Sequence, residues 1–128
     1  MKIEEIISID RILLNEKLLS KKAVLEKLAS LMAVENTNFN ADQIEDRLLS
    51  RERLGTTGLG GGIAIPHARI ALNGRPLGAF LRTTKLIDFD ALDDQPVDLF
   101  FGLCVPEKYV GEHLDLLAQL ANAFSDGE

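Results

Sequence analysis

Two histidines and one arginine are the residues of this chain best suited to chemistry. His67 follows Pro66 at the end of a short apolar run, and His113 is the only other histidine. A neutral imidazole is available at physiological pH because its ordinary pKa is about 6.5. Its nitrogen can attack phosphorus and hold a phosphoryl group covalently. We therefore predict phosphoryl transfer through His67, with a surface histidine at a turn as the structural alternative.

His113 has two interpretations. It shares one side of a predicted helix with Leu117 and Leu120, which is typical of a core or boundary histidine. Paired with His67, it would instead bind a metal or donate a hydrogen bond to a phosphoryl oxygen. A metal site needs three or more protein ligands, and no HxH, HxxxH or HxxE spacing is present. We expect no metal site.

Arg51 is predicted near the C-terminal end of a helix, just before a glycine tract that runs from Gly55 to Gly62. A cation there favours the helix dipole, and a guanidinium also offers a planar fork for phosphate oxygens. For a phosphoryl group on His67, the candidate stabilising side chains are Arg51 and His113. The additional candidate donors are Thr57 and the backbone N–H groups of Gly61 and Gly62.

The glycine tract does not match the known phosphate loops. A P-loop requires a Lys followed by Ser or Thr after its last glycine, and none is present. A dinucleotide fingerprint requires a helix after the glycines, whereas Ile63-Ala64-Ile65-Pro66 predicts a strand that stops at the proline. The tract therefore predicts a turn, either a flexible one or one whose small residues let the backbone come close to a bound group beside the strand end.

The charge distribution is asymmetric. The 128 residues carry a net charge of −6, which argues against general nucleic-acid binding. The segment from Arg47 to Lys85 has seven basic residues and one acid, Glu52, so its net charge is +6 while the remainder carries −12. Chance clustering on solvated faces is one explanation. A local anion site is the other.

The composition indicates one globular domain. Hydrophobic residues make up 46% and charged residues 27%. The single cysteine, Cys104, lies in an apolar run and excludes a disulfide framework. No run reaches the roughly 18 apolar residues of a membrane-spanning helix, and the acidic N-terminus is unlike a signal peptide. We expect a cytoplasmic protein without membrane insertion.

The hydrophobic patterns predict an α/β fold, a mixed β-sheet sandwiched by α-helices. The predicted helices run from about Ser20 to Met32, with Ser20 as N-cap, from Ala41 to Arg53 after an Asn40–Gln43 capping box, and from Val110 to Phe124. The predicted strands are an edge piece Ile12–Leu14, the run ending at Pro66, Leu77–Thr84, a short piece Leu86–Phe89, and Val97–Val105, which is apolar enough to be buried on both faces.

The segment from Ser50 to Arg69, SRERLGTTGLGGGIAIPHAR, resembles the active-site stretch of the fructose/mannitol-type IIA proteins of the bacterial phosphoenolpyruvate-dependent phosphotransferase system. LGTTGLG before GIAIPH is similar to the nitrogen-regulatory branch. Gly78–Thr83, Val105-Pro106-Glu107 and Glu112-His113-Leu114 extend the resemblance over essentially the whole chain.

The resemblance implies a mannitol-IIA-like fold, His67 as the phosphorylated residue, and His113 and Arg51 as its active-site partners. It also implies an HPr-like phosphocarrier as donor, regulated partners such as potassium-transport or sensor-kinase components, and no cofactor. Ala68 departs from the glycine of many members. Residues 1–128 are expected to be one EIIA type-2 domain that lacks the family's C-terminal segment. A sugar-transport IIA that passes phosphate to a IIB domain, and a non-catalytic interaction module, remain the alternatives.

Overall fold

The computed structural model describes residues 9–33, 40–70 and 77–106. Its elements, in chain order, are a short 3-10 helix η2 (Ile9–Arg11), β1 (Ile12–Glu16), α1 (Lys21–Ala33), α2 (Ala41–Leu54), β2 (Gly58–Gly60), β3 (Ile63–Ala64), β4 (His67–Ile70), β5 (Leu77–Ile87) and β6 (Val97–Pro106). The described helices and strands form a single α/β domain, as the sequence predicts.

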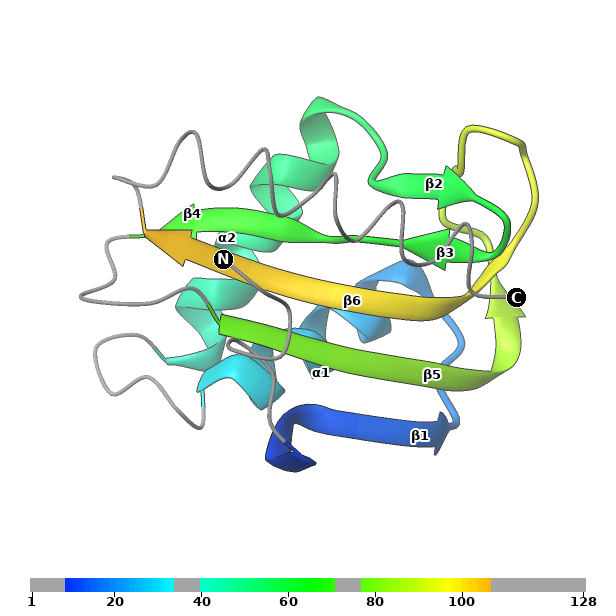
Figure 1. Ribbon diagram of the computed structural model, residues 1–128. Coiled ribbons are helices and arrows are strands. Elements are labelled where there is room, and N and C mark those ends of the chain that lie inside the picture. The colour runs from blue at the N-terminus through cyan, green and yellow to red at the C-terminus, as the bar shows by residue number, and fades with distance from the viewer. Residues whose placement is uncertain (1–8, 34–39, 71–76, 107–128) are drawn as a thin grey trace.

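The strands form one mixed sheet in the order β1-β5-β6-β3-β2, and β4 also pairs with β6. β5 runs antiparallel to β6, while β1 is parallel to β5 and both β3 and β4 are parallel to β6. β3 and β4 therefore lie end to end along the same side of β6 (Figure 1). This arrangement places the residues between them, Ile65 and Pro66, beside the middle of β6.

Both described helices begin where the sequence predicts. The Ser20 hydroxyl accepts a hydrogen bond from the Ala23 N–H at 3.1 Å. The Asn40 side chain accepts from the Gln43 N–H at 2.8 Å, and the Gln43 side chain accepts from the Asn40 N–H at 2.9 Å. These bonds satisfy backbone donors that have no partner within the helix. The predicted N-cap and capping box are confirmed.

Two strand predictions need correction. The run from Leu77 to Ile87 is one strand, not two pieces, because a register shift between Arg82 and Ile87 lets β5 remain paired with β6. The glycine tract contains a short strand, β2, which pairs with β3. The strand after the tract, β3, ends at Ala64, before Pro66, as the sequence predicts, and a new strand follows directly. The Pro66 carbonyl accepts from the Leu103 N–H at 2.9 Å, so pairing with β6 resumes in β4.

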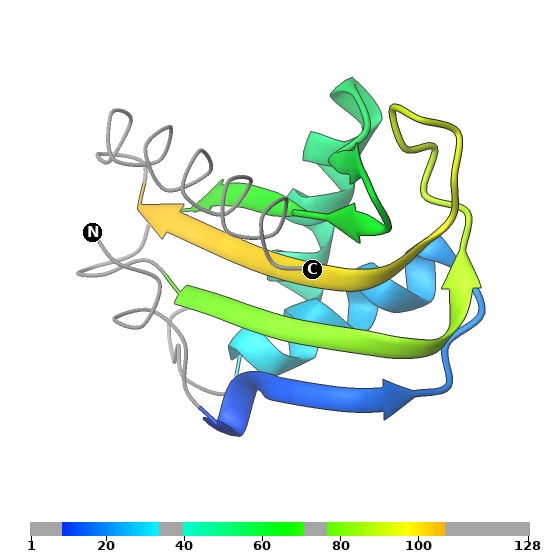
Figure 2. The ribbon, with the colours of Figure 1, turned by 45° about the vertical axis from the view of Figure 1, so that its right-hand side comes forward.

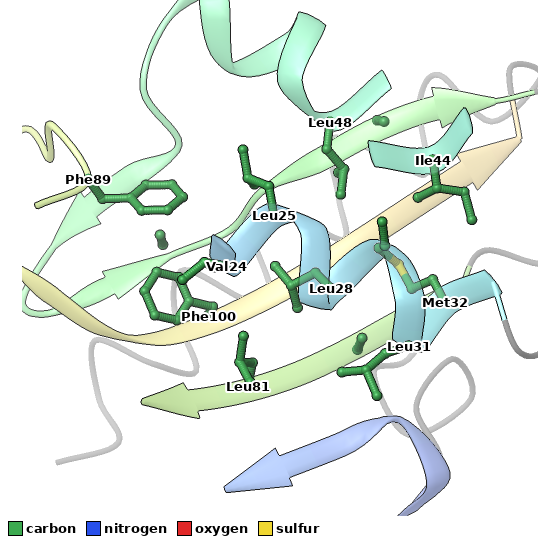
Figure 3. Packing of buried hydrophobic residues seen from close by; sticks show 14 of the residues in the cluster. Val24, Leu25, Leu28, Leu31, Met32, Ile44, Leu48, Leu81, Phe89 and Phe100 are labelled. Carbon is green, nitrogen blue, oxygen red and sulfur yellow. The ribbon is translucent and has the colours of Figure 1, made fainter. Parts of the chain in front are cut away.

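Helices α1 and α2 cover the same face of the sheet (Figures 1 and 2). Fully buried side chains of α1, such as Leu25 and Leu28, point between α2 and the sheet (Figure 3). Phe89 and Phe100 pack with ring centroids 5.2 Å apart. Every described side chain from Phe100 to Val105 is buried, which confirms a strand enclosed on both faces.

The helix predicted from Val110 to Phe124 lies outside the described residues. Among the helices of the described ranges, none is long and apolar enough to cross a membrane.

Candidate active site

His67 is the first residue of β4 and lies beside Leu103 of β6. The sequence predicts a histidine beyond the end of a strand, at the rim of the sheet. In the structure His67 is instead the first residue of a new strand, because β4 pairs with β6 directly after the proline. The pairing of β4 with β6 therefore fixes the backbone of His67 directly after Pro66.

The two ring nitrogens of His67 have different partners. Nδ1 lies 2.9 Å from the Ile65 carbonyl oxygen. A carbonyl can only accept, so Nδ1 carries the proton and Nε2 carries the lone pair. Arg51 Nε donates to Nε2 at 3.2 Å, which agrees with this assignment. The geometry favours a neutral imidazole whose nucleophilic nitrogen is Nε2.

Arg51 reaches the ring from the last turn of α2. Its Nη1 donates to the Gly55 carbonyl at 2.9 Å, just after the helix ends. The backbone that follows α2 therefore anchors the guanidinium while Nε faces His67. The structure thus brings together Arg51 and His67, which lie 16 positions apart in the sequence.

The pKa of His67 is lowered from its ordinary value of 6.5. Burial of the ring is the largest cause, since a buried imidazolium loses hydration. The hydrogen bond to Ile65 and the Glu52 charge act in the opposite direction, while Arg51 and Arg69 lower the pKa further. The ring is therefore held neutral and nucleophilic at pH 7.

A hollow of about 370 Å³ opens beside the ring, lined by Arg47, Ser50, Arg51, Leu54, His67, Ala68 and Arg69. Three of the seven basic residues of the positive segment lie on its wall. Arg47 Nη1 donates to the Arg69 carbonyl at 3.4 Å, which links α2 to β4 across the hollow. The excess of positive charge in the sequence thus lies partly around His67 and suits an anion.

Sequence reasoning missed Glu52, the single acid of the positive segment. Its carboxylate is buried, lies 3.0 Å from Lys21 Nζ, and accepts both the Thr57 N–H at 2.9 Å and the Thr57 hydroxyl at 2.7 Å. Both polar hydrogens of Thr57 thus point to Glu52. A lone acid in a basic segment was the available signal, but charge alone does not reveal that it is buried.

Gly61 and Gly62 form the turn between β2 and β3, with φ values of 69° and 81°. The Gly61 N–H donates to Asp93 Oδ2 at 3.0 Å. Neither glycine lines the hollow around His67, so the role predicted for them stays a prediction.

His113 lies outside the described residues, and its predicted part in the site also stays a prediction. Within the described ranges, no three His, Cys, Asp or Glu side chains gather in a group that could hold a metal ion.

The fold and the site define a class: a mixed-sheet α/β protein with a half-buried, neutral histidine backed by an arginine in a basic hollow. The chain belongs to the EIIA 2 family of the phosphoenolpyruvate-dependent sugar phosphotransferase system, whose model matches residues 5–128. The resemblance stated from the motif is therefore confirmed.

The chain is 48% identical over 121 residues to a nitrogen regulatory protein of Pseudomonas aeruginosa, which covers 94% of this chain and 79% of that relative. It is 37% identical to the fructose-specific EIIA component of Haloferax volcanii, with the same coverage of 94% and 79%. The crystal structure of nitrogen regulatory protein IIA-Ntr from Neisseria meningitidis superimposes with a TM-score of 0.91 at 43% identity, covering 96% of this chain and 84% of that one. The Escherichia coli IIA mannitol structure, at 20% identity and a TM-score of 0.75 over 93% of this chain and 83% of that one, shares the fold.

Proposed function

We propose that this protein is a phosphohistidine carrier of the nitrogen-type phosphotransferase system. It accepts a phosphoryl group from an HPr-like carrier and regulates partner proteins according to its phosphorylation state. The observation that carries the proposal is the arrangement of the His67 ring, with Nδ1–H donating to Ile65 and Nε2 facing Arg51 in a basic hollow. The family and the nitrogen regulatory relatives support the same function.

The transfer step follows from the tautomer. The Nε2 lone pair attacks the phosphorus of a phosphohistidine on the donor protein, and a P–Nε2 bond forms as the donor's P–N bond breaks. The electron pair of the broken bond stays on the donor's ring nitrogen. His67 keeps its Nδ1 proton, so positive charge develops on the ring, and the hydrogen bond to Ile65 stabilises that charge.

Arg51 acts on the oxygens of the transferred group. In the resting site its Nε occupies the Nε2 lone pair at 3.2 Å, a weak bond that must break before attack. The guanidinium then lies beside the incoming phosphoryl group, where its N–H donors bind the oxygens. Arg47 and Arg69 add positive charge from the walls of the hollow. Positioning and charge stabilisation of this kind supply most of the catalysis in phosphoryl transfer.

Several parts of this proposal rest on the sequence. His113 is proposed as a second donor to the phosphoryl group, and Thr57 as an assisting residue, although its two polar hydrogens point to Glu52. Potassium-transport and sensor-kinase components are the proposed classes of regulated partner. The cytoplasm is the proposed location, since the donor proteins of the system act there.

A sugar-transport role is the second candidate, favoured by the fructose-specific relative from Haloferax volcanii. It uses the same chemistry at His67 and differs in the acceptor. Onward transfer from the phosphorylated protein to a sugar-specific IIB domain would support it over the regulatory role.

The test is incubation with phosphoenolpyruvate and the upstream carriers, followed by intact-mass analysis for an acid-labile adduct of one phosphoryl group. We expect the adduct in the wild type and its loss in His67→Ala. Arg51→Ala should slow its formation, whereas Arg53→Ala, an exposed arginine two residues along α2, serves as the matched control. An adduct of undiminished yield in His67→Ala would refute the assignment. Absence of labelling in the wild type, with normal partner binding by His67→Ala and His67→Asp, would support the interaction module instead.

A further inference from the structure

An ion pair between the half-buried Lys21 and the buried Glu52, the residue next to Arg51 in the sequence, connects the two helices. Lys21 Nζ lies 3.0 Å from Glu52 Oε2, and the Glu52 side chain is only 5% exposed. Lys21 also lies 3.3 Å from Asp90 Oδ2 and 4.7 Å from the centroid of the Phe89 ring. Removing the Glu52 carboxylate from water is costly, so a pair of this kind is weak evidence for stability in itself.

The positions of both residues in their helices are also unfavourable. Lys21 is the first residue of α1, where the positive end of the helix dipole disfavours a cation. Glu52 lies in the last turn of α2, where the negative end disfavours an acid. Neither charge stabilises the helix that carries it. A role in the neighbouring site explains why both charges are present.

Hydrogen bonds lead from Glu52 to the His67 ring. Glu52 accepts the N–H and the hydroxyl of Thr57, which fixes the peptide that follows α2. The Thr57 carbonyl accepts from the Ile65 N–H at 3.0 Å. The Ile65 carbonyl in turn accepts from His67 Nδ1 at 2.9 Å. Each bond orients the group that makes the next one.

We infer that Glu52, held by Lys21, is a positioning residue that fixes the Nδ1–H tautomer and the orientation of His67 through Thr57 and Ile65. This inference deepens the proposed function and rests on it for its effect on transfer. Glu52 does not touch the phosphoryl group. Its second effect is electrostatic, because the carboxylate favours the positive charge that develops on the His67 ring during attack. In the resting protein the Glu52 charge acts to raise the pKa of His67, which is an effect of the same sign.

The experiment compares Glu52→Gln with Glu16→Gln in the full chain. Glu16 pairs with Lys27 at 3.8 Å on the surface, so its variant makes the same charge change outside the site. The readouts are the ¹⁵N chemical shifts of the His67 ring nitrogens and the initial rate of phosphorylation by the upstream carriers.

We expect Glu52→Gln to convert a single Nδ1–H signal pattern into a mixture of tautomers. Phosphorylation should slow by about 10- to 100-fold, since misplacement of a reacting group by an ångström has effects of that size. Glu16→Gln should match the wild type in both readouts. Unchanged ring shifts in a folded Glu52→Gln protein, together with a rate within twofold of the wild type, would overturn the inference.

A second pair of variants applies if Glu52→Gln does not fold. Thr57→Val removes the hydroxyl that donates to Glu52, and Thr57→Ser retains it. We expect tautomer mixing in Thr57→Val and wild-type ring shifts in Thr57→Ser. Identical ring shifts in the two variants would refute the positioning chain. The ring shifts need no donor protein, so a wild type that is never phosphorylated refutes the proposed function while the tautomer result still decides the role of Glu52.

Discussion

Replacing Gly58 by alanine tests how tightly the start of β2 packs against the segment after β5. Gly58 is buried and has no positive φ, so the backbone tolerates a side chain and the effect is steric. A Cβ there would lie 2.9 Å from both the Cα and the Cβ of Ala91. Hydrogen bonds hold Ala91 in place, since its carbonyl accepts from the Asp94 N–H at 2.9 Å and the Leu92 N–H donates to Gly58 at 3.2 Å.

The size of the effect follows from these distances. Carbon atoms pack best at about 3.5–4.0 Å, so two contacts must open by roughly 0.6 Å or more. Overpacking of this kind costs about 1–3 kcal/mol. Replacing glycine also lowers the conformational entropy of the unfolded chain, which stabilises the folded state by about 0.4–1 kcal/mol. We therefore expect a net loss of about 1–2 kcal/mol in the free energy of unfolding, or roughly 4–8 °C in Tm.

Urea unfolding at constant pH measures this change, with Ala91→Gly as the compensating variant. Ala91→Gly should recover part of the loss in Gly58→Ala because it removes one of the two clashing atoms. It should recover nothing in Gly61→Ala, where the new Cβ has open space and the cost arises from a φ of 69°. A Gly58→Ala protein as stable as the wild type, or equally destabilised with and without Ala91→Gly, would refute the packing argument.

Three further outcomes are expected. Arg51→Ala should raise the pKa of His67, because the change removes a nearby cation and exposes the ring to more water. Arg53→Ala should leave this pKa unchanged, and an NMR titration of the ring measures both variants. The pKa of His67 is lower in the folded than in the unfolded chain, so the unfolded state binds more protons between that pKa and 6.5. The free energy of unfolding should therefore fall as pH drops through this window, and a His67→Gln protein that showed the same slope in urea titrations would contradict the assignment. Burial raises the pKa of the Cys104 thiol to about 12, so a thiol reagent at pH 8 should label it only after unfolding, and rapid labelling of the folded protein would contradict its burial.

Local patterns predicted much of the fold. The capping box at Asn40 and the N-cap at Ser20 determine where helices begin, because these side chains satisfy donors only a few residues away. The apolar run from Val97 to Val105 predicted a buried strand for a similar reason, since uniform hydrophobicity leaves no face for water. The missing N–H of Pro66 predicted a strand end, and β3 does end before it, but the sequence did not show that β4 follows directly along β6. The Pro66 carbonyl still accepts a hydrogen bond from the Leu103 N–H of β6. Hydrophobic periodicity contains no information about such a bond between distant residues.

For the candidate site, the sequence by itself indicated the family and the candidate residues. The motif from Ser50 to Arg69 identified His67 and Arg51 and indicated the family, because residue types and short spacings are properties of the chain. Only the tertiary structure decided which ring nitrogen of His67 carries the lone pair and that Glu52 lies buried against Lys21, 31 positions away in the sequence. Tautomer, burial and ion pairing depend on which distant groups the fold brings within hydrogen-bond distance, and one-dimensional spacing does not contain that information.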